Sequence, residues 1–137
     1  MPLTVQEVPL QYVNAVWPSV EGFVASAVAH AQGDITLDEA KMQCIHGSWT
    51  LLVAVDTENE VHGAMTLYYF NRMNDRVAFI TTVGGKSILN PELFSQLSAI
   101  VASHGATCIE GAVRDSMLRF VARFGAKKKT TTVRIAV

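Results

Sequence analysis

The 137-residue sequence has little charge and no long apolar run. Charged residues make up 17% of the chain and the formal net charge is -1 at pH 7, so no overall charge attracts nucleic acid or an anionic membrane. The one concentrated charge, Lys127-Lys128-Lys129, fits a solvated turn. No window reaches the roughly 18 to 20 apolar residues that a membrane span needs. We therefore expect neither a nucleic-acid partner nor a membrane partner.

Cysteine is also scarce. Cys44 and Cys108 stand far apart with no CxxC or His/Cys spacing, which predicts no metal site and no disulfide framework. Both fit small buried groups in a reducing compartment. The first residues, Met1 to Thr4, lack a basic region followed by an apolar stretch, so we expect a cytoplasmic protein.

Apolar residues are abundant, at half of the chain. This content predicts a large core, a partner surface, or both. The length suits one compact domain over residues 1–137. A homodimer would explain the apolar content, and so would a large core alone.

The first part of the sequence predicts a strand and then helices. Residues 3–8 alternate apolar and polar side chains, as a half-buried strand does. Apolar residues recur at helical spacing from Leu10 to Ala31, and Pro18 is expected to divide this run into a short helix and a longer one. Thr36 and Glu39 resemble a capping box that opens a helix to about Ile45, with Gly47 as its stop.

The remaining part predicts a meander and then alternating elements. Residues 49–55, 61–70 and 76–83 are apolar strands joined by short polar turns, which requires antiparallel pairing. Asn90 and Pro91 open a helix that ends near His104-Gly105. A strand at 107–113, a short helix at 116–124 and an alternating strand at 130–137 complete the chain.

This order predicts an α+β (α/β three-layer) fold. Its mixed, mostly antiparallel central sheet would have about six strands and helices on both faces. The connection from strand 76–83 through a helix to strand 107–113 requires one parallel crossover.

The pair Gly84-Gly85 lies where a strand gives way to a loop and a helix N-terminus. Free backbone N–H groups and the helix dipole suit such a place to a phosphate-bearing ligand. Paired glycines serve ordinary turns equally well, so the local sequence leaves both interpretations open.

The segment from Val83 to Ala126 resembles the second half of a GNAT (acyl-CoA N-acyltransferase) domain. Its features are the paired glycine after one strand, Glu110-Gly111-Ala112-Val113-Arg114 at the end of the next, and a short helix running into Phe124-Gly125. It is most similar to the divergent phage and prophage branch, and the upstream order of elements is also that of the family. The resemblance therefore covers essentially the whole chain.

The resemblance implies acetyl transfer from acetyl-CoA to a small-molecule or protein amine. It assigns binding of acetyl-CoA to one stretch and one arginine: Val83, Gly84, Gly85, Lys86, Ser87, Ile88 and Arg114. The pantetheine arm would run between strands 76–83 and 107–113. A phage-encoded member would be located in the host cytoplasm or in the virion.

The candidate bases are Glu110, at a strand in the expected cleft, and His62, because histidine is a residue type that can serve as a base near neutral pH. A surface carboxylate and a turn histidine are the plainer interpretations of the two. The tyrosine that family members often use to protonate the thiolate would align with Val121, which cannot donate a proton. The alternative is therefore a non-catalytic GNAT-fold phage or prophage protein that acts as a structural or interaction component.

Overall fold

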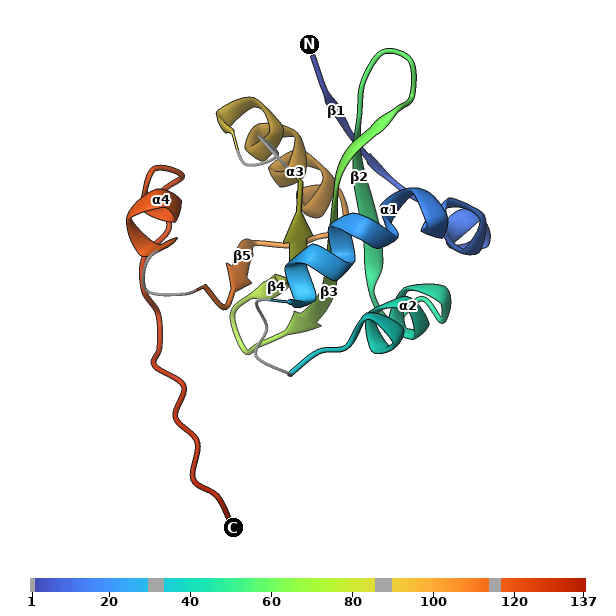
Figure 1. Cartoon of the computed structure of the whole chain (residues 1–137). Coiled ribbons are helices and arrows are strands. Elements are labelled where there is room, and N and C mark those ends of the chain that lie inside the picture. Colours follow the sequence, from blue (N-terminus) through green and yellow to red (C-terminus); the bar gives the residue numbers. More distant parts are fainter. Residues whose placement is uncertain (1, 30–33, 86–89, 114–116) are drawn as a thin grey trace.

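A computed structural model describes residues 2–29, 34–85, 90–113 and 117–137 (Figure 1). Its elements are, in chain order, β1 (Thr4–Glu7), η1 (Leu10–Tyr12), α1 (Val13–Val28), α2 (Leu37–Ile45), β2 (Thr50–Val55), β3 (Val61–Asn71), β4 (Arg76–Gly84), α3 (Pro91–Ser103), β5 (Cys108–Gly111) and α4 (Leu118–Ala122). The strands form one sheet in the order β1-β2-β3-β4-β5. The pairs are antiparallel except for β4 and β5, which are parallel. The expected fold class, the meander and the parallel crossover are confirmed.

Helices cover both faces of the sheet. One core layer joins α1 and α2 to β2, with Trp17, Val20 and Cys44 at most 2% exposed. The other joins α3 to the opposite face through Leu52, Leu67, Leu97 and other apolar side chains. Apolar positions alternate along β2 between these two layers because successive strand side chains point to opposite faces.

Local sequence signals mark both ends of α2 and the start of α3. The Thr36 hydroxyl accepts a hydrogen bond from the Glu39 N–H at 3.1 Å, and the Asn90 side chain accepts one from the Leu93 N–H at 2.9 Å. Gly47 follows α2 with a φ of +82°, a conformation that glycine adopts without strain. The described residues contain no helix that is long and apolar enough to cross a membrane.

Two expectations about elements were wrong. Pro18 lies inside α1 and does not divide it, because the buried stripe of Val13, Trp17, Val20 and Val24 holds the helix against the sheet across the proline. Residues 130–137 do not form a strand, and the sheet has five strands among the described residues. In Figure 1 this C-terminal segment runs away from the domain.

Candidate functional site

Strands β4 and β5 are paired along only part of β4. Their parallel register runs from Val77 opposite Cys108 to Ile80 opposite Gly111, where β5 ends. β4 continues beyond Ile80 to Gly84. Within the described residues, this last part of β4 has a strand partner on the β3 side only. The pairing thus ends within the two strands, 76–83 and 107–113, between which the family resemblance implies the pantetheine arm.

A β-bulge lies in β4 at the same place. Thr66 of β3 is opposite Thr82, and the next residue, Leu67, is opposite Ile80, so Thr81 is the extra residue. The Thr81 hydroxyl donates to the carbonyl oxygen of Thr66 at 3.0 Å, and the Thr66 hydroxyl oxygen lies 2.6 Å from that of Thr82. A bulge redirects the strand and disturbs the regular pairing around its extra residue. Here it does so where β5 ends.

Gly84 and Gly85 are required by the packing of the chain itself. A Cβ on Gly84 would lie 2.2 Å from the carbonyl oxygen of Phe23 in α1. Gly85 has a φ of +122°, and a Cβ there would lie 2.6 Å from the carbonyl oxygen of His62. Both contacts are shorter than real Cβ atoms make. The glycine pair therefore lets the end of β4 pass between α1 and the start of β3, a reason that the sequence did not reveal.

The other expected binding residues are only partly described. Val83 packs against the α3 side of the core. Lys86, Ser87, Ile88 and Arg114 lie outside the described residues. After that gap, α3 begins at Pro91 and its first turn is capped by Asn90.

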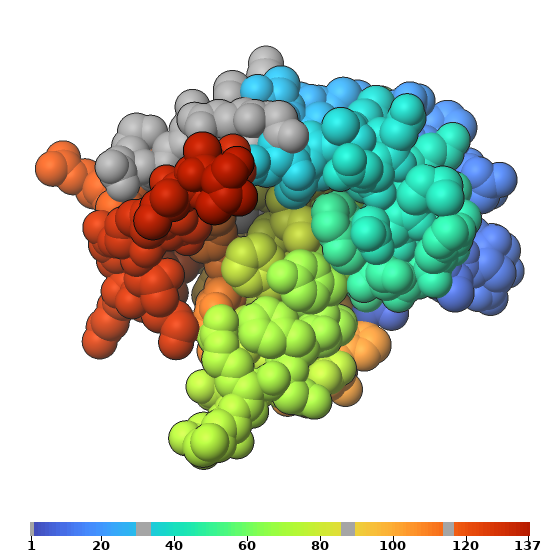
Figure 2. Space-filling view, turned by 90° about the horizontal axis from the view of Figure 1, so that it is seen from below, coloured from blue at the N-terminus to red at the C-terminus, as the bar shows by residue number. Residues whose placement is uncertain are grey.

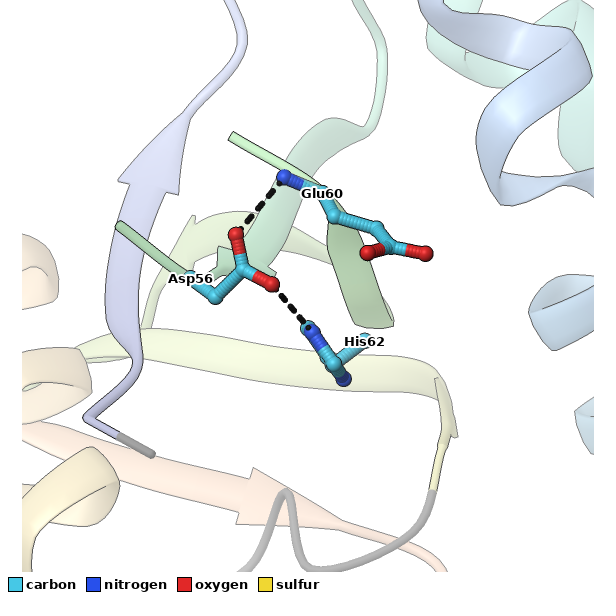
Figure 3. A group of neighbouring side chains, drawn as sticks. All are labelled: Asp56, Glu60 and His62. Carbon is cyan, nitrogen blue, oxygen red and sulfur yellow. Dashed lines mark hydrogen bonds and ion pairs between the residues drawn. The ribbon is translucent and has the colours of Figure 1, made fainter. Parts of the chain in front are cut away.

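The β2–β3 turn holds a buried carboxylate against a histidine (Figure 3). Asp56, whose side chain is 2% exposed, accepts backbone hydrogen bonds from Glu58 at 2.8 Å and Glu60 at 3.0 Å. His62 Nε2 donates to the second carboxylate oxygen at 2.8 Å. These bonds, with that of His62 first, lower the pKa of the Asp56 carboxyl. The hydrogen bond from Nε2 to Asp56 fixes the orientation of the His62 ring.

The same three side chains have the residue types of a metal site. The ligand atoms of Asp56, Glu60 and His62 lie within 4.8 Å of one another. The hydrogen bonds to Asp56 already account for its burial, so an ion is not needed to explain the turn. The expectation of no metal stays a prediction.

Glu110 lies in β5 opposite Phe79, and two cationic side chains lie near its carboxylate. Its carboxylate forms an ion pair with Arg72 of the β3–β4 hairpin, and Lys129 Nζ lies 3.9 Å away. The bond from Arg72 lowers the pKa of Glu110. The two candidate bases therefore have different partners. Glu110 is paired with cations, and His62 with an anion.

A groove of about 420 Å³ lies elsewhere, between the start of α1 and strands β1 and β2. Gln6, Tyr12 and Val53 are among its lining residues. Because β1 and β5 are at opposite edges of the sheet, this groove is separate from the place where β4 and β5 part.

Comparison with known proteins supports the fold. No family model matches the sequence, and no curated protein matches it. Among solved structures, an aminoglycoside acetyltransferase from an uncultured soil sample is 14% identical with a TM-score of 0.71, over 100% of this chain and 99% of that one. The glucosamine-6-phosphate N-acetyltransferase of Arabidopsis thaliana is 10% identical with a TM-score of 0.63, over 99% of both chains.

A second aminoglycoside acetyltransferase from soil, solved with sisomicin, is 11% identical with a TM-score of 0.69, over 98% of this chain and 96% of that one. At these identities the likeness concerns the fold. The chain has the GNAT-like fold of these acetyltransferases.

Proposed function

We propose that the chain is a GNAT-type acyltransferase that takes acetyl-CoA between β4 and β5 and moves the acetyl group to an amine. The observation that carries the proposal is the end of β4–β5 pairing at Ile80 and Gly111, next to the bulge at Thr81. An extended pantetheine arm can bond to backbone groups of a strand in the way that an added strand does. Structural neighbours named as acetyltransferases support the same assignment.

The phosphates of acetyl-CoA would lie at the loop from Val83 to Ile88, before α3, with Arg114 as a further cation. Free N–H groups and the positive end of the helix dipole suit phosphate there. The space at Gly84 and Gly85 is taken up by Phe23 and His62 of the chain itself, so these glycines support the loop without forming a cradle for the ligand.

Transfer needs the amine to lose a proton as it attacks the thioester carbon. The new C–N bond forms, the C–S bond breaks, and CoA leaves as a thiol once a proton reaches its sulfur. We assign the base role to His62 in preference to Glu110. With Nε2–H donated to Asp56, the other ring nitrogen of His62 is free to accept a proton. Glu110 is held ionised by Arg72, and its lowered pKa makes it the weaker base.

The acceptor in this proposal is a small-molecule or protein amine, and the reaction takes place in the cytoplasm. Two neighbours carry the name of aminoglycosides and one that of glucosamine-6-phosphate. Both kinds of compound contain an amino sugar, so amino sugars and aminoglycosides are the first small molecules to test.

A non-catalytic role is the second candidate, as a structural or interaction component of phage or prophage origin. Two observations favour it. Val121, in the helix α4 where family members often carry an acid tyrosine, has no proton to donate. Glu110 is neutralised by Arg72 and Lys129.

Isothermal titration with acetyl-CoA tests the proposal. We expect a single saturable site, and no detectable binding at millimolar acetyl-CoA would end both the transferase proposal and the placement of the ligand. Release of CoA thiol in the presence of amino sugars and a lysine peptide then measures turnover. Binding without turnover on any of these amines would favour the non-catalytic candidate.

The base assignment has its own test. In His62→Gln we expect acetyl-CoA affinity to be retained and kcat to fall by about 10²-fold or more, the usual contribution of a general base. His46→Gln is the matched control, because His46 is an exposed histidine at the end of α2. Equal kcat in the His62 variant and the control would remove His62 from the mechanism.

A further inference from the structure

A row of side chains crosses three strands on the face of the sheet that carries α1 and α2. Tyr68 of β3 is opposite Phe79 of β4, and Phe79 is opposite Glu110 of β5. The neighbours of these residues along each strand belong to the core layer under α3, namely Tyr69, Ile80 and Ile109. Because successive side chains of a strand point to opposite faces, the row lies on the α1 side.

Three aromatic rings contact one another at this row. The ring centroids of Tyr68 and Phe79 are 5.4 Å apart. Phe70, the next residue of β3 on the same face, lies 5.8 Å from Tyr68 by the same measure. All three side chains are partly exposed, and none belongs to either core layer of the described residues. We call these three rings the aromatic shelf. Contiguous apolar surface of this kind is typical of a place that binds a ligand.

Charged side chains adjoin the aromatic shelf. Arg72 forms an ion pair with Glu110, and its guanidinium carbon lies 4.9 Å from the centroid of the Phe70 ring. Lys129 Nζ lies 3.9 Å from the same carboxylate. The two cations are more exposed than the anion they share, because the side chain of Glu110 is 18% exposed and those of Arg72 and Lys129 are 39% and 56%. An incoming molecule therefore meets a positive surface.

The other carboxylate of the β3–β4 hairpin does not change this charge balance at the shelf. Asp75 accepts a hydrogen bond from the Thr107 hydroxyl at 3.0 Å. It is followed by Arg76, whose guanidinium lies 5.1 Å from the centroid of the Tyr69 ring. Asp75 thus has a cation beside it in the chain and a hydrogen-bond donor of its own.

The aromatic shelf lies beside the place where the acetyl donor is proposed to bind. Pairing of β4 with β5 ends at Ile80 and Gly111, one residue beyond Phe79 and Glu110. Figure 2 shows a hollow between the β3–β4 strands (yellow-green), α2 (teal) and the C-terminal segment (red). This hollow is on the side of the sheet that carries α2, the side to which the shelf belongs.

We propose that the aromatic shelf and its cations bind the acceptor amine, and that this acceptor carries an anionic group, a phosphate or a carboxylate. The proposal rests on the proposed transferase function, since an acceptor presupposes transfer. The anionic group binds to Arg72 and Lys129, and the body of the acceptor packs on the shelf. A guanidinium has more N–H donors than one carboxylate can accept from, so Arg72 can bind Glu110 and the acceptor together.

The same surface disfavours acceptors that carry only positive charge. Like charges brought together at a binding surface lower affinity, and the exposed groups beside the shelf are cations. An aminoglycoside such as sisomicin, which has several amines and no anionic group, is expected to bind weakly. The charge of the surface thus separates the two kinds of acceptor that the names of the structural neighbours suggest.

Calorimetric titration with matched ligands tests the proposal. Glucosamine-6-phosphate and glucosamine differ only in the phosphate, and phenylalanine and phenethylamine differ only in the carboxylate. Protein saturated with CoA is used, so that no turnover occurs. We expect one anionic ligand to bind about tenfold or more tightly than its counterpart, and the pair that shows the difference identifies the anionic group. No preference in either pair, or tighter binding of sisomicin, would overturn the proposal.

Substitutions separate the cations from the aromatic shelf. Arg72→Gln is expected to weaken binding of the preferred anionic ligand about tenfold and to leave its counterpart almost unchanged. Lys127→Gln is the matched control, because it removes one positive charge from an exposed position. Phe79→Leu should instead weaken both members of the pair by a similar factor. Equal affinities in the Arg72 and Lys127 variants would refute the role of Arg72.

A second variant covers the case in which Arg72→Gln does not fold. Lys129 lies outside the helices and strands of the described chain, so Lys129→Gln leaves the ion pair between β3 and β5 in place. It is expected to weaken the anionic ligand more than its counterpart. An equal effect on both ligands would contradict the proposal.

Titration with acetyl-CoA keeps the two proposals apart. Arg72→Gln is expected to bind acetyl-CoA as the unaltered chain does. A chain that binds acetyl-CoA without any preference for anionic amines would retain the transferase proposal and refute the acceptor assignment. Binding of an anionic amine that depends on Arg72, in a chain that does not bind acetyl-CoA, would keep the ligand site and end the transferase proposal.

Discussion

Gly84→Ala is expected to destabilise the domain by about 3 kcal/mol, because the end of β4 touches the backbone of α1. The added Cβ would lie 2.2 Å from the carbonyl oxygen of Phe23, while real Cβ atoms essentially never come closer than 3.0 Å. Roughly 0.8 Å must therefore be gained by moving backbone. Overpacking in a tight core typically costs about 1 to 3 kcal/mol, and a backbone obstacle places this substitution at the upper end.

The effect is large enough to measure by thermal unfolding. For a domain of this size about 3 kcal/mol corresponds to a decrease in Tm of about 10 °C. Gly22→Ala is the control, since Gly22 lies in α1 near Phe23 and its Cβ would meet nothing within 4 Å. Alanine there should stabilise the helix by about 0.5 to 1 kcal/mol.

An unchanged Tm in Gly84→Ala would refute the packing argument. If the variant instead lost acetyl-CoA affinity at full stability, Gly84 would contact the ligand directly. The expected loss of stability also means that larger residues at this position are poor probes of ligand binding.

Three further results follow from local contacts. Leu67→Ala, at a fully buried position of β3, should lower the free energy of unfolding by about 2 to 5 kcal/mol in urea titrations, and a loss below 1 kcal/mol would contradict the core assignment. Asn90→Ala removes the acceptor for the Leu93 N–H and should cost about 1 kcal/mol, with Asn90→Ser nearly neutral. Asp56 has a lowered pKa in the folded state, so its stabilisation is present above its unfolded pKa of about 4 and is lost as the pH falls through the folded value. Asp56→Asn should therefore flatten the fall in stability below about pH 4, and an unchanged pH profile would show that the ionised carboxylate of Asp56 does not stabilise the fold.

The sequence was informative wherever structure depends on neighbours along the chain. The caps at Thr36 and Asn90, the stop at Gly47 and the alternation in the meander act within a few residues, and each lies where the pattern placed it. The order of elements then limits the fold to few arrangements, because short connections force antiparallel pairing and the one long crossover forces a parallel pair.

Contacts that depend on how turns and strands are placed in space could not be predicted from patterns along the sequence. Asp56 is only six residues from His62, yet its role depends on a turn that buries one carboxylate between two backbone N–H groups. The pairing of Glu110 with Arg72 joins residues from different strands. Nothing in the local sequence distinguishes such a paired carboxylate from a catalytic one.

By itself, then, the sequence determined the kinds of element, their order and the fold class, since these follow from periodicity, turn chemistry and connection length. Tertiary structure decided the rest. Pro18 stays within a helix because packing against the sheet outweighs the bond it cannot make. Residues 130–137 have strand propensity but form no strand, because propensity alone does not make a strand and none of the described strands pairs with them. Gly84 is needed because α1, some sixty residues away in sequence, crosses the end of β4.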